Sequence, residues 1–199
     1  MNRKILIGIL ILAFLAQLAV PVYSILSEEL LLKNGKEYKF RTALADPYDP
    51  FKGRYVYLSF VDDTVEKEKD LVANRIQNMY AIITEDENGF AKISKLSKDV
   101  PNTKEYIKVE VFPEYYANME NRIKVKFPFD RYYMDEELAP EAEKLMREKV
   151  IDKVDVYATV FVKSGKSVLD KLYINGKTIE QEAKEVVRQK KLKVQSGQI

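Results

Sequence analysis

The chain opens with one continuous apolar stretch and then changes to short alternating runs. Residues 5–22 are apolar except for Gln17, and this length of about 18 residues is enough to cross a bilayer as a helix. The stretch is apolar on every face, unlike a helix that buries one stripe in a protein core. The sequence therefore predicts a transmembrane helix near the N-terminus.

The residues around this stretch predict its orientation. Arg3 and Lys4 precede it, which favours a cytoplasmic N-terminus and an extracytoplasmic remainder. A cleaved signal peptide is the alternative, but it needs a short apolar core followed by an A-x-A-like site. The small residues Ala16 and Ala19 lie deep inside the apolar run instead. We favour an uncleaved, single-pass anchor in the cell membrane.

Three segments follow from this reading of the chain. Residues 1–23 form the membrane anchor, and residues 24–36 form a juxtamembrane helical segment that extends it and ends at Asn34-Gly35. Residues 37–199 form an extracytoplasmic β-rich domain. We find no internal repeat and no low-complexity linker in the sequence.

Most of the third segment alternates apolar and polar residues with a period of two, which is typical of half-buried strands. Alternation predicts strands over residues 36–44 and 54–61, with Val56, Leu58 and Phe60 on one face of the second. The mixed charges of residues 62–75 indicate a solvated loop or an exposed short helix. Three strand pairs are expected after it, spanning residues 77–97, 105–129 and 154–174. Gly89 supplies the turn of the first pair.

Two helices interrupt the strands. Apolar residues at helical spacing predict a helix over Ala139–Val150, and Pro140 suits its first turn. Thr178 and Gln181 resemble a capping box that begins a C-terminal helix. Because strands outnumber helices and rarely alternate with them, the expected class is α+β. The chain thus combines an N-terminal transmembrane helix with a β-rich antiparallel domain that carries one or two helices.

Composition narrows the chemistry. The 199 residues include no Cys and no His, which removes disulfides, thiol nucleophiles, the commonest general base and the main zinc ligand. Net charge is +2 without a concentrated basic patch, so we expect no nucleic-acid partner. No cofactor and no metal site is predicted. Carboxylates, Lys, Tyr, Arg and Ser remain for catalysis or binding.

Two motifs hold candidate carboxylates. Asp46 and Asp49 each precede a proline, and such steps either build turns by bonding backbone N–H groups or place two carboxylates together for acid–base work. Glu137 lies among acidic residues before the predicted helix. The SGKS stretch at residues 164–167 lacks the first glycine of a phosphate-binding loop, since position 160 is Val, and it reads as a hairpin turn.

The segment Arg131-Tyr132-Tyr133 is the other candidate site. An arginine beside two tyrosines suits binding of an anionic or aromatic group. The alternative is structural: the arginine pairs with an internal carboxylate and the tyrosines pack against a sheet.

These motifs together resemble a known family. DPYDPFKGRYVYLSF at residues 46–60, followed by DRYYMDEELAPEAE at residues 130–143, is similar to the GDYXXLXY family of membrane-anchored bacterial proteins. Members share an N-terminal membrane helix, a D-P-x-D-P-F-[RK]-G lead-in, the G-D-Y-x-x-L-x-Y signature and a later R-[YF]-[YF]-x-x-E segment.

The signature is carried here by Gly53, Tyr55, Leu58 and Phe60. Two positions depart from it: Arg54 stands where relatives have an aspartate, and Phe60 replaces the last tyrosine. The first change reverses a charge, which puts any ligand role of that aspartate in doubt in this chain. Phe60 keeps the aromatic ring and loses the hydroxyl, which suggests that this position serves packing.

The resemblance implies an envelope location and work alongside multi-pass membrane proteins. Our leading hypothesis is an uncharacterised membrane-anchored protein, more a binder than an enzyme, that binds or scaffolds a membrane partner. One alternative is a carboxylate-based hydrolase using Asp46, Asp49 or Glu137. Another is an envelope small-molecule sensor, which needs a polar-lined pocket near Arg131 and Tyr133.

Overall fold

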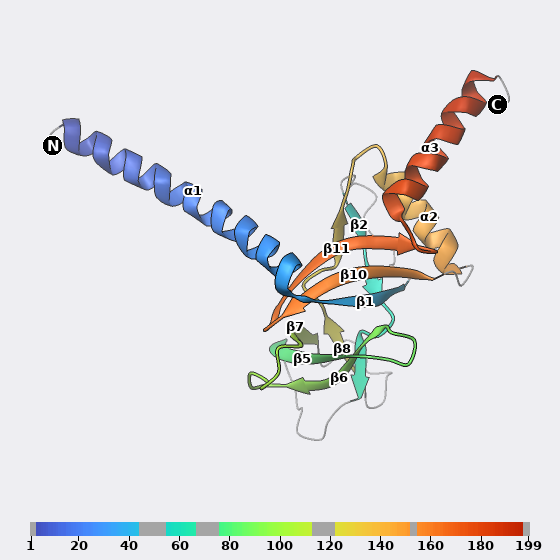
Figure 1. Ribbon diagram of the computed structural model, residues 1–199, viewed down its shortest axis with the longest axis horizontal. Coiled ribbons are helices and arrows are strands. Elements are labelled where there is room, and N and C mark those ends of the chain that lie inside the picture. The colour runs from blue at the N-terminus through green and yellow to red at the C-terminus, as the bar shows by residue number, and fades with distance from the viewer. Residues whose placement is uncertain (1–2, 44–54, 67–75, 113–121, 152–154, 197–199) are drawn as a thin grey trace.

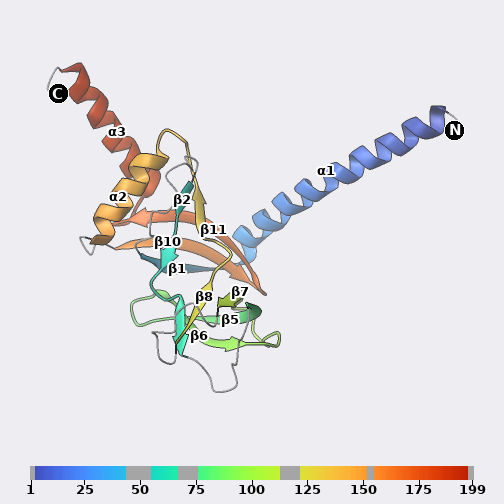
Figure 2. The same cartoon turned by 180° about the vertical axis from the view of Figure 1, so that it is seen from behind.

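A long helix projects from a β-rich domain that carries two further helices (Figure 1). The computed structural model describes residues 3–43, 55–66, 76–112, 122–151 and 155–196. The arrangement confirms the predicted α+β class, with an apolar helix first and an antiparallel β domain after it. The view from behind shows the same separation of the first helix from the domain (Figure 2).

Helix α1 (Arg3–Asn34) is continuous through both predicted N-terminal segments and includes Pro21. Its most apolar 18-residue window has a mean hydropathy of 2.7 and is entirely unburied, so the helix is long and apolar enough to be a membrane span or a signal sequence. At 1.5 Å per residue its 32 residues extend about 48 Å, beyond the roughly 30 Å of a hydrocarbon core.

The C-terminal end of α1 packs on the domain. Leu31 is buried, and the N–H of Gly35 donates to the Leu31 carbonyl at 2.7 Å. A Cβ at Gly35 would lie 2.6 Å from that carbonyl oxygen and 3.2 Å from Cβ of Phe161. The close approach of helix and sheet therefore needs a glycine at this position.

Two sheets and a short ribbon make up the β domain, and their named strands pair antiparallel throughout the described residues. The first sheet has the order β12-β11-β10-β1-β3 and consists of β1 (Lys36–Ala43), β3 (Ser59–Phe60), β10 (Val156–Lys163), β11 (Lys166–Ile174) and β12 (Lys177–Thr178). The second has the order β4-β8-β7-β5-β6 and consists of β4 (Thr64–Glu66), β5 (Gln77–Glu85), β6 (Ala91–Ser97), β7 (Tyr106–Phe112) and β8 (Arg122–Lys126). The ribbon pairs β2 (Tyr55–Tyr57) with β9 (Arg131–Tyr133).

The three predicted strand pairs are confirmed as β5–β6, β7–β8 and β10–β11. Gly89 adopts φ +75° in the first turn and Gly165 φ +85° in the third, so SGKS is a hairpin turn. The loop-or-helix prediction for residues 62–75 is wrong at Thr64–Glu66, which forms β4 against β8. Val65 packs against the core there, and that burial outweighs the charged surroundings.

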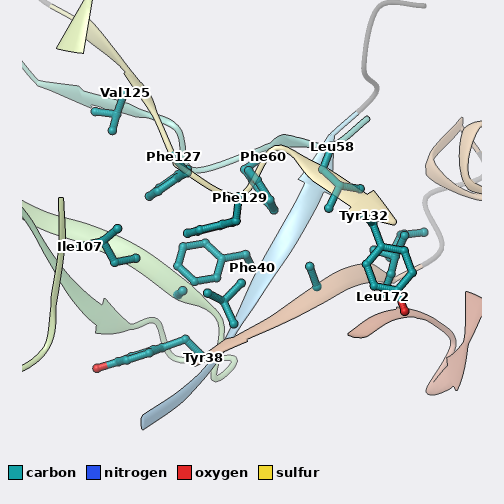
Figure 3. Close-up of a cluster of buried hydrophobic side chains, with 14 of the residues drawn as sticks. Tyr38, Phe40, Leu58, Phe60, Ile107, Val125, Phe127, Phe129, Tyr132 and Leu172 are labelled. Carbon is teal, nitrogen blue, oxygen red and sulfur yellow. The ribbon is translucent and has the colours of Figure 1, made fainter. Parts of the chain in front are cut away.

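Aromatic rings fill the space where the sheets and the ribbon meet (Figure 3). The ring centroid of Phe40 lies 5.8, 5.3 and 5.2 Å from those of Phe60, Phe127 and Phe129, each edge-on. Such pairs add about 0.5–1.5 kcal/mol each beyond the burial of their surface. The cluster ties β1 and β3 to the segment between β8 and β9.

Helix α2 (Ala139–Ile151) confirms the predicted helix and runs one residue further. The Asp135 carboxylate accepts the N–H of Glu137 at 2.9 Å just before it. Helix α3 (Ile179–Gln195) follows β12, and the N–H of Thr178 donates to the Gln181 side chain at 3.3 Å, as the capping box predicts. The two helices pack on each other, α2 also against β2 and β10 and α3 against β11.

Candidate functional site

The predicted strand over residues 54–61 divides at Leu58 into β2 and β3. Val56, Leu58 and Phe60 are buried, as the alternation predicts. The backbone N–H of Leu58 donates to the Asp130 carbonyl at 2.8 Å, outside both strands. The chain therefore leaves the ribbon and joins the first sheet, where β3 pairs with β1.

The ribbon brings together the two motifs that carry the family resemblance. Tyr55 pairs with Tyr133, Val56 with Tyr132 and Tyr57 with Arg131. Because directly opposed residues share a face and the side chains alternate along each strand, four side chains project to one side. We call this set the Tyr–Arg surface; it consists of Tyr55, Tyr57, Arg131 and Tyr133.

The Tyr–Arg surface is open to solvent. Tyr57 is 47% exposed and Tyr133 66% exposed, and the Arg131 side chain is 48% exposed. The rings of Tyr55 and Tyr133 meet edge-on with centroids 5.6 Å apart. The guanidinium carbon of Arg131 lies 5.3 Å from the Tyr55 ring centroid, within cation–π range.

Neighbouring groups shift the pKa values of two side chains on this surface. A hydrogen bond with Tyr133 and the nearby charge of Asp130 raise the pKa of Arg131, whose Nε lies 3.7 Å from Asp130 Oδ1. Partial burial, followed by the Asp130 charge, raises the pKa of the Tyr57 hydroxyl. The surface thus presents the Arg131 cation beside the protonated hydroxyl of Tyr57 at neutral pH.

The opposite face of the ribbon is structural. Tyr132 is 8% exposed, and its hydroxyl donates to Glu180 Oε1 on helix α3. Figure 3 shows its ring beside Leu172 of β11. Burial, with the Glu180 hydrogen bond and charge, raises the pKa of Tyr132. The structural interpretation of this segment therefore applies to Tyr132, which packs inside. Arg131 and Tyr133 on either side face outward, as the binding interpretation requires.

A cleft of about 570 Å³ adjoins the Tyr–Arg surface at Arg131. It lies between the end of α1, strands β7 and β8, and the start of β11, and we call it the α1 cleft. Its lining includes Ser27 and Glu28 from α1, Lys108 from β7, and Lys166 and Ser167 from β11. The sensor hypothesis requires a polar-lined pocket near Arg131 and Tyr133. This cleft includes Arg131 but not Tyr133 in its lining, so the hypothesis stays a prediction.

Glu137 lies apart from this region. It lines a second cleft of about 390 Å³ between the start of α2 and helix α3, and the lining also includes Lys184, Arg188 and Lys191. Asp46, Asp49, Gly53 and Arg54 lie outside the described residues, so the hydrolase hypothesis stays a prediction. Among the described residues, no group of three or more Asp or Glu side chains is placed to hold a metal ion.

Sequence reasoning did not identify Tyr57, Lys108 or Lys166 as site residues. Tyr57 carried a usable signal, because it shares a strand face with the signature residue Tyr55. The sequence around Lys108 and Lys166 carried no such signal. Only the fold brings these two lysines into one cleft.

Comparison with known proteins gives one result. A family model described as GDYXXLXY protein matches residues 17–172, from within α1 to Leu172 of β11. The matched part includes the Tyr–Arg surface and the α1 cleft and ends before α3. No curated protein and no solved structure matches the chain.

Proposed function

The chain belongs to the GDYXXLXY protein family, and from this premise we propose that it is a single-pass, membrane-anchored envelope protein that binds a membrane partner. The observation that carries the proposal is the Tyr–Arg surface, which combines the signature tyrosine of one motif with the arginine and tyrosine of another.

The anchor is supported by the length and exposure of α1. Its most apolar window is wholly unburied, so nothing in the described part of the domain covers that surface. Tyr23 follows the apolar stretch, where aromatic residues commonly mark a membrane interface. Arg3 and Lys4 before the stretch support a cytoplasmic N-terminus. Tags at both ends of the chain test this: loss of the N-terminal tag from the mature protein contradicts the anchor.

The chemistry of the Tyr–Arg surface suits a protein partner. Tyr and Arg are the residue types enriched, with Trp, among the side chains that dominate binding energy at interfaces. Here three tyrosines and one arginine are held by a paired ribbon, so little backbone freedom remains to be lost on binding. Arg131 adds a permanent cation that pairs with a carboxylate of the partner.

Anchoring favours a partner in the same membrane. A tethered surface meets other proteins of that membrane at a high effective concentration, which strengthens an otherwise modest interface. A multi-pass membrane protein with an acidic extracytoplasmic loop fits both the tether and the charge.

Alanine variants of the full chain in native membranes test the proposal. Tyr57→Ala/Tyr133→Ala removes two exposed rings of the surface. We expect recovery of co-purified membrane protein to fall at least tenfold, because interface truncations of this kind cost about 2 kcal/mol or more. Ile76→Ala/Val100→Ala is the matched control, since those side chains are 59% and 61% exposed elsewhere. Equal recovery from both variants, with unchanged melting temperatures, contradicts the proposal.

A further inference from the structure

We propose that the α1 cleft binds a phosphate group, and that this phosphate belongs to the headgroup of an anionic phospholipid. The lipid source rests on the membrane anchoring proposed above. The binding chemistry itself rests on the cleft.

Two lysines of the cleft, Lys108 and Lys166, lie on neighbouring elements. The N–H of Lys108 donates to the Gly165 carbonyl at 3.1 Å, so β7 and the turn that precedes Lys166 are held side by side. Neither Lys108 nor Lys166 forms an ion pair within the described residues, although both are exposed and line the cleft. Two cations brought to one cleft by the backbone favour an anion between them.

The other charges of the cleft largely balance. Lys126 Nζ lies 3.9 Å from Glu110 Oε2, and Arg131 pairs with Asp130 at 3.7 Å. Glu28 is the remaining acid of the lining. The lining therefore holds four cations and three acids. Once these two pairs are set aside, Lys108 and Lys166 remain against Glu28, which leaves a net charge of +1.

A phosphate suits two neighbouring ammonium groups. Its oxygens accept from several donors at the same time, so one phosphate satisfies both lysines.

The position of the cleft on α1 indicates where the phosphate comes from. Ser27 lies five residues after Val22, the last residue of the predicted span, which is about 8 Å along the helix. The headgroup layer on each side of a bilayer is roughly 5–8 Å thick. The rim of the cleft at Ser27 and Glu28 therefore lies at headgroup level when α1 spans the membrane.

Native mass spectrometry of the full chain in detergent tests this, with phosphatidylglycerol and phosphatidylcholine as probes. Wild type should retain phosphatidylglycerol preferentially. Lys108→Gln/Lys166→Gln should lower its affinity roughly 30-fold, since a basic residue near an anionic headgroup contributes about fivefold. Lys92→Gln/Lys171→Gln removes two exposed strand lysines outside the cleft and should leave retention unchanged.

Inorganic phosphate, titrated against the melting temperature of the same proteins, separates the two sources. A rise in melting temperature that needs Lys108 and Lys166, without lipid preference, supports phosphate binding and overturns the lipid source. If neither probe distinguishes the cleft variant from the control variant, phosphate binding is overturned, even where the cleft variant loses a co-purified protein. Because no partner is present in these measurements, their failure leaves the Tyr–Arg surface untouched.

Discussion

The contact between Tyr132 and Glu180 joins the ribbon to helix α3, and removing one hydroxyl tests how much that junction contributes to stability. Tyr132→Phe keeps the buried ring and deletes the hydrogen bond to Glu180 Oε1. A hydrogen bond to a charged group contributes about 1.5–3 kcal/mol. Glu180 is partly exposed, so water solvates it after the change and the lower part of that range, about 1.5–2 kcal/mol, is expected.

Urea unfolding of the full chain in mild detergent, followed by circular dichroism, measures this change. Tyr173→Phe is the control, because no hydrogen bond of its hydroxyl is seen within the described residues, and its cost should stay below about 0.5 kcal/mol. A double-mutant cycle with Glu180→Ala should give a coupling of at least about 1 kcal/mol. A coupling near zero would show that the contact is fully solvated and that it does not stabilise the junction of the ribbon with α3.

The contact between Tyr132 and Glu180 also predicts how the free energy of unfolding falls at alkaline pH. The folded pKa of Tyr132 is raised, chiefly by burial, above the value of about 10 in the unfolded chain. Its contribution to the free energy of unfolding is therefore complete below pH 10 and is lost as pH rises through the folded pKa. Wild type should lose stability above pH 10 more steeply than Tyr132→Phe, and parallel curves would contradict the assignment.

Three further predictions concern stability, each measured by urea unfolding. Gly165→Ala should cost about 1–3 kcal/mol more than Gly89→Ala: both have positive φ, but only at Gly165 would the new Cβ lie 2.9 Å from an aromatic carbon. Equal costs would contradict this. Phe40→Ala should cost about 3–5 kcal/mol, and a value under 2 would mean that the cluster collapses around the gap. The hydrogen bond from the Phe90 N–H lowers the pKa of Asp86. The stability that this carboxylate contributes is therefore present above pH 4 and is lost as pH falls through the folded pKa. Asp86→Asn should make the free energy of unfolding fall less steeply with pH in acid. The same acid dependence in wild type and variant would contradict a stabilising role of the Asp86 carboxylate.

Local patterns in the sequence predicted much of the fold. The alternation around Tyr38 and Phe40 identified β1, and the helical spacing after Leu138 identified α2. These patterns are readable because each strand or helix buries one face regardless of its partners. Gly89 was equally readable, since a tight turn needs a residue that accepts positive φ.

The candidate site depended on contacts between distant parts of the chain. Tyr55 and Arg131 were each singled out, yet nothing in either motif showed that β2 pairs with β9 or in which register. A shift of one residue would have placed Tyr132 outside and Tyr133 inside. The α1 cleft was still less visible, because its lysines come from β7, β8 and β11 and its rim comes from a helix.

Photo-cross-linking in native membranes tests whether the Tyr–Arg surface binds a membrane partner. A photoreactive amino acid replaces Tyr133 on the Tyr–Arg surface or, as control, the exposed Lys92 on β6. We expect a discrete cross-linked membrane protein from position 133 that is absent from position 92. No cross-link from position 133, or the same products from both positions, would contradict the claim that this surface binds a membrane partner.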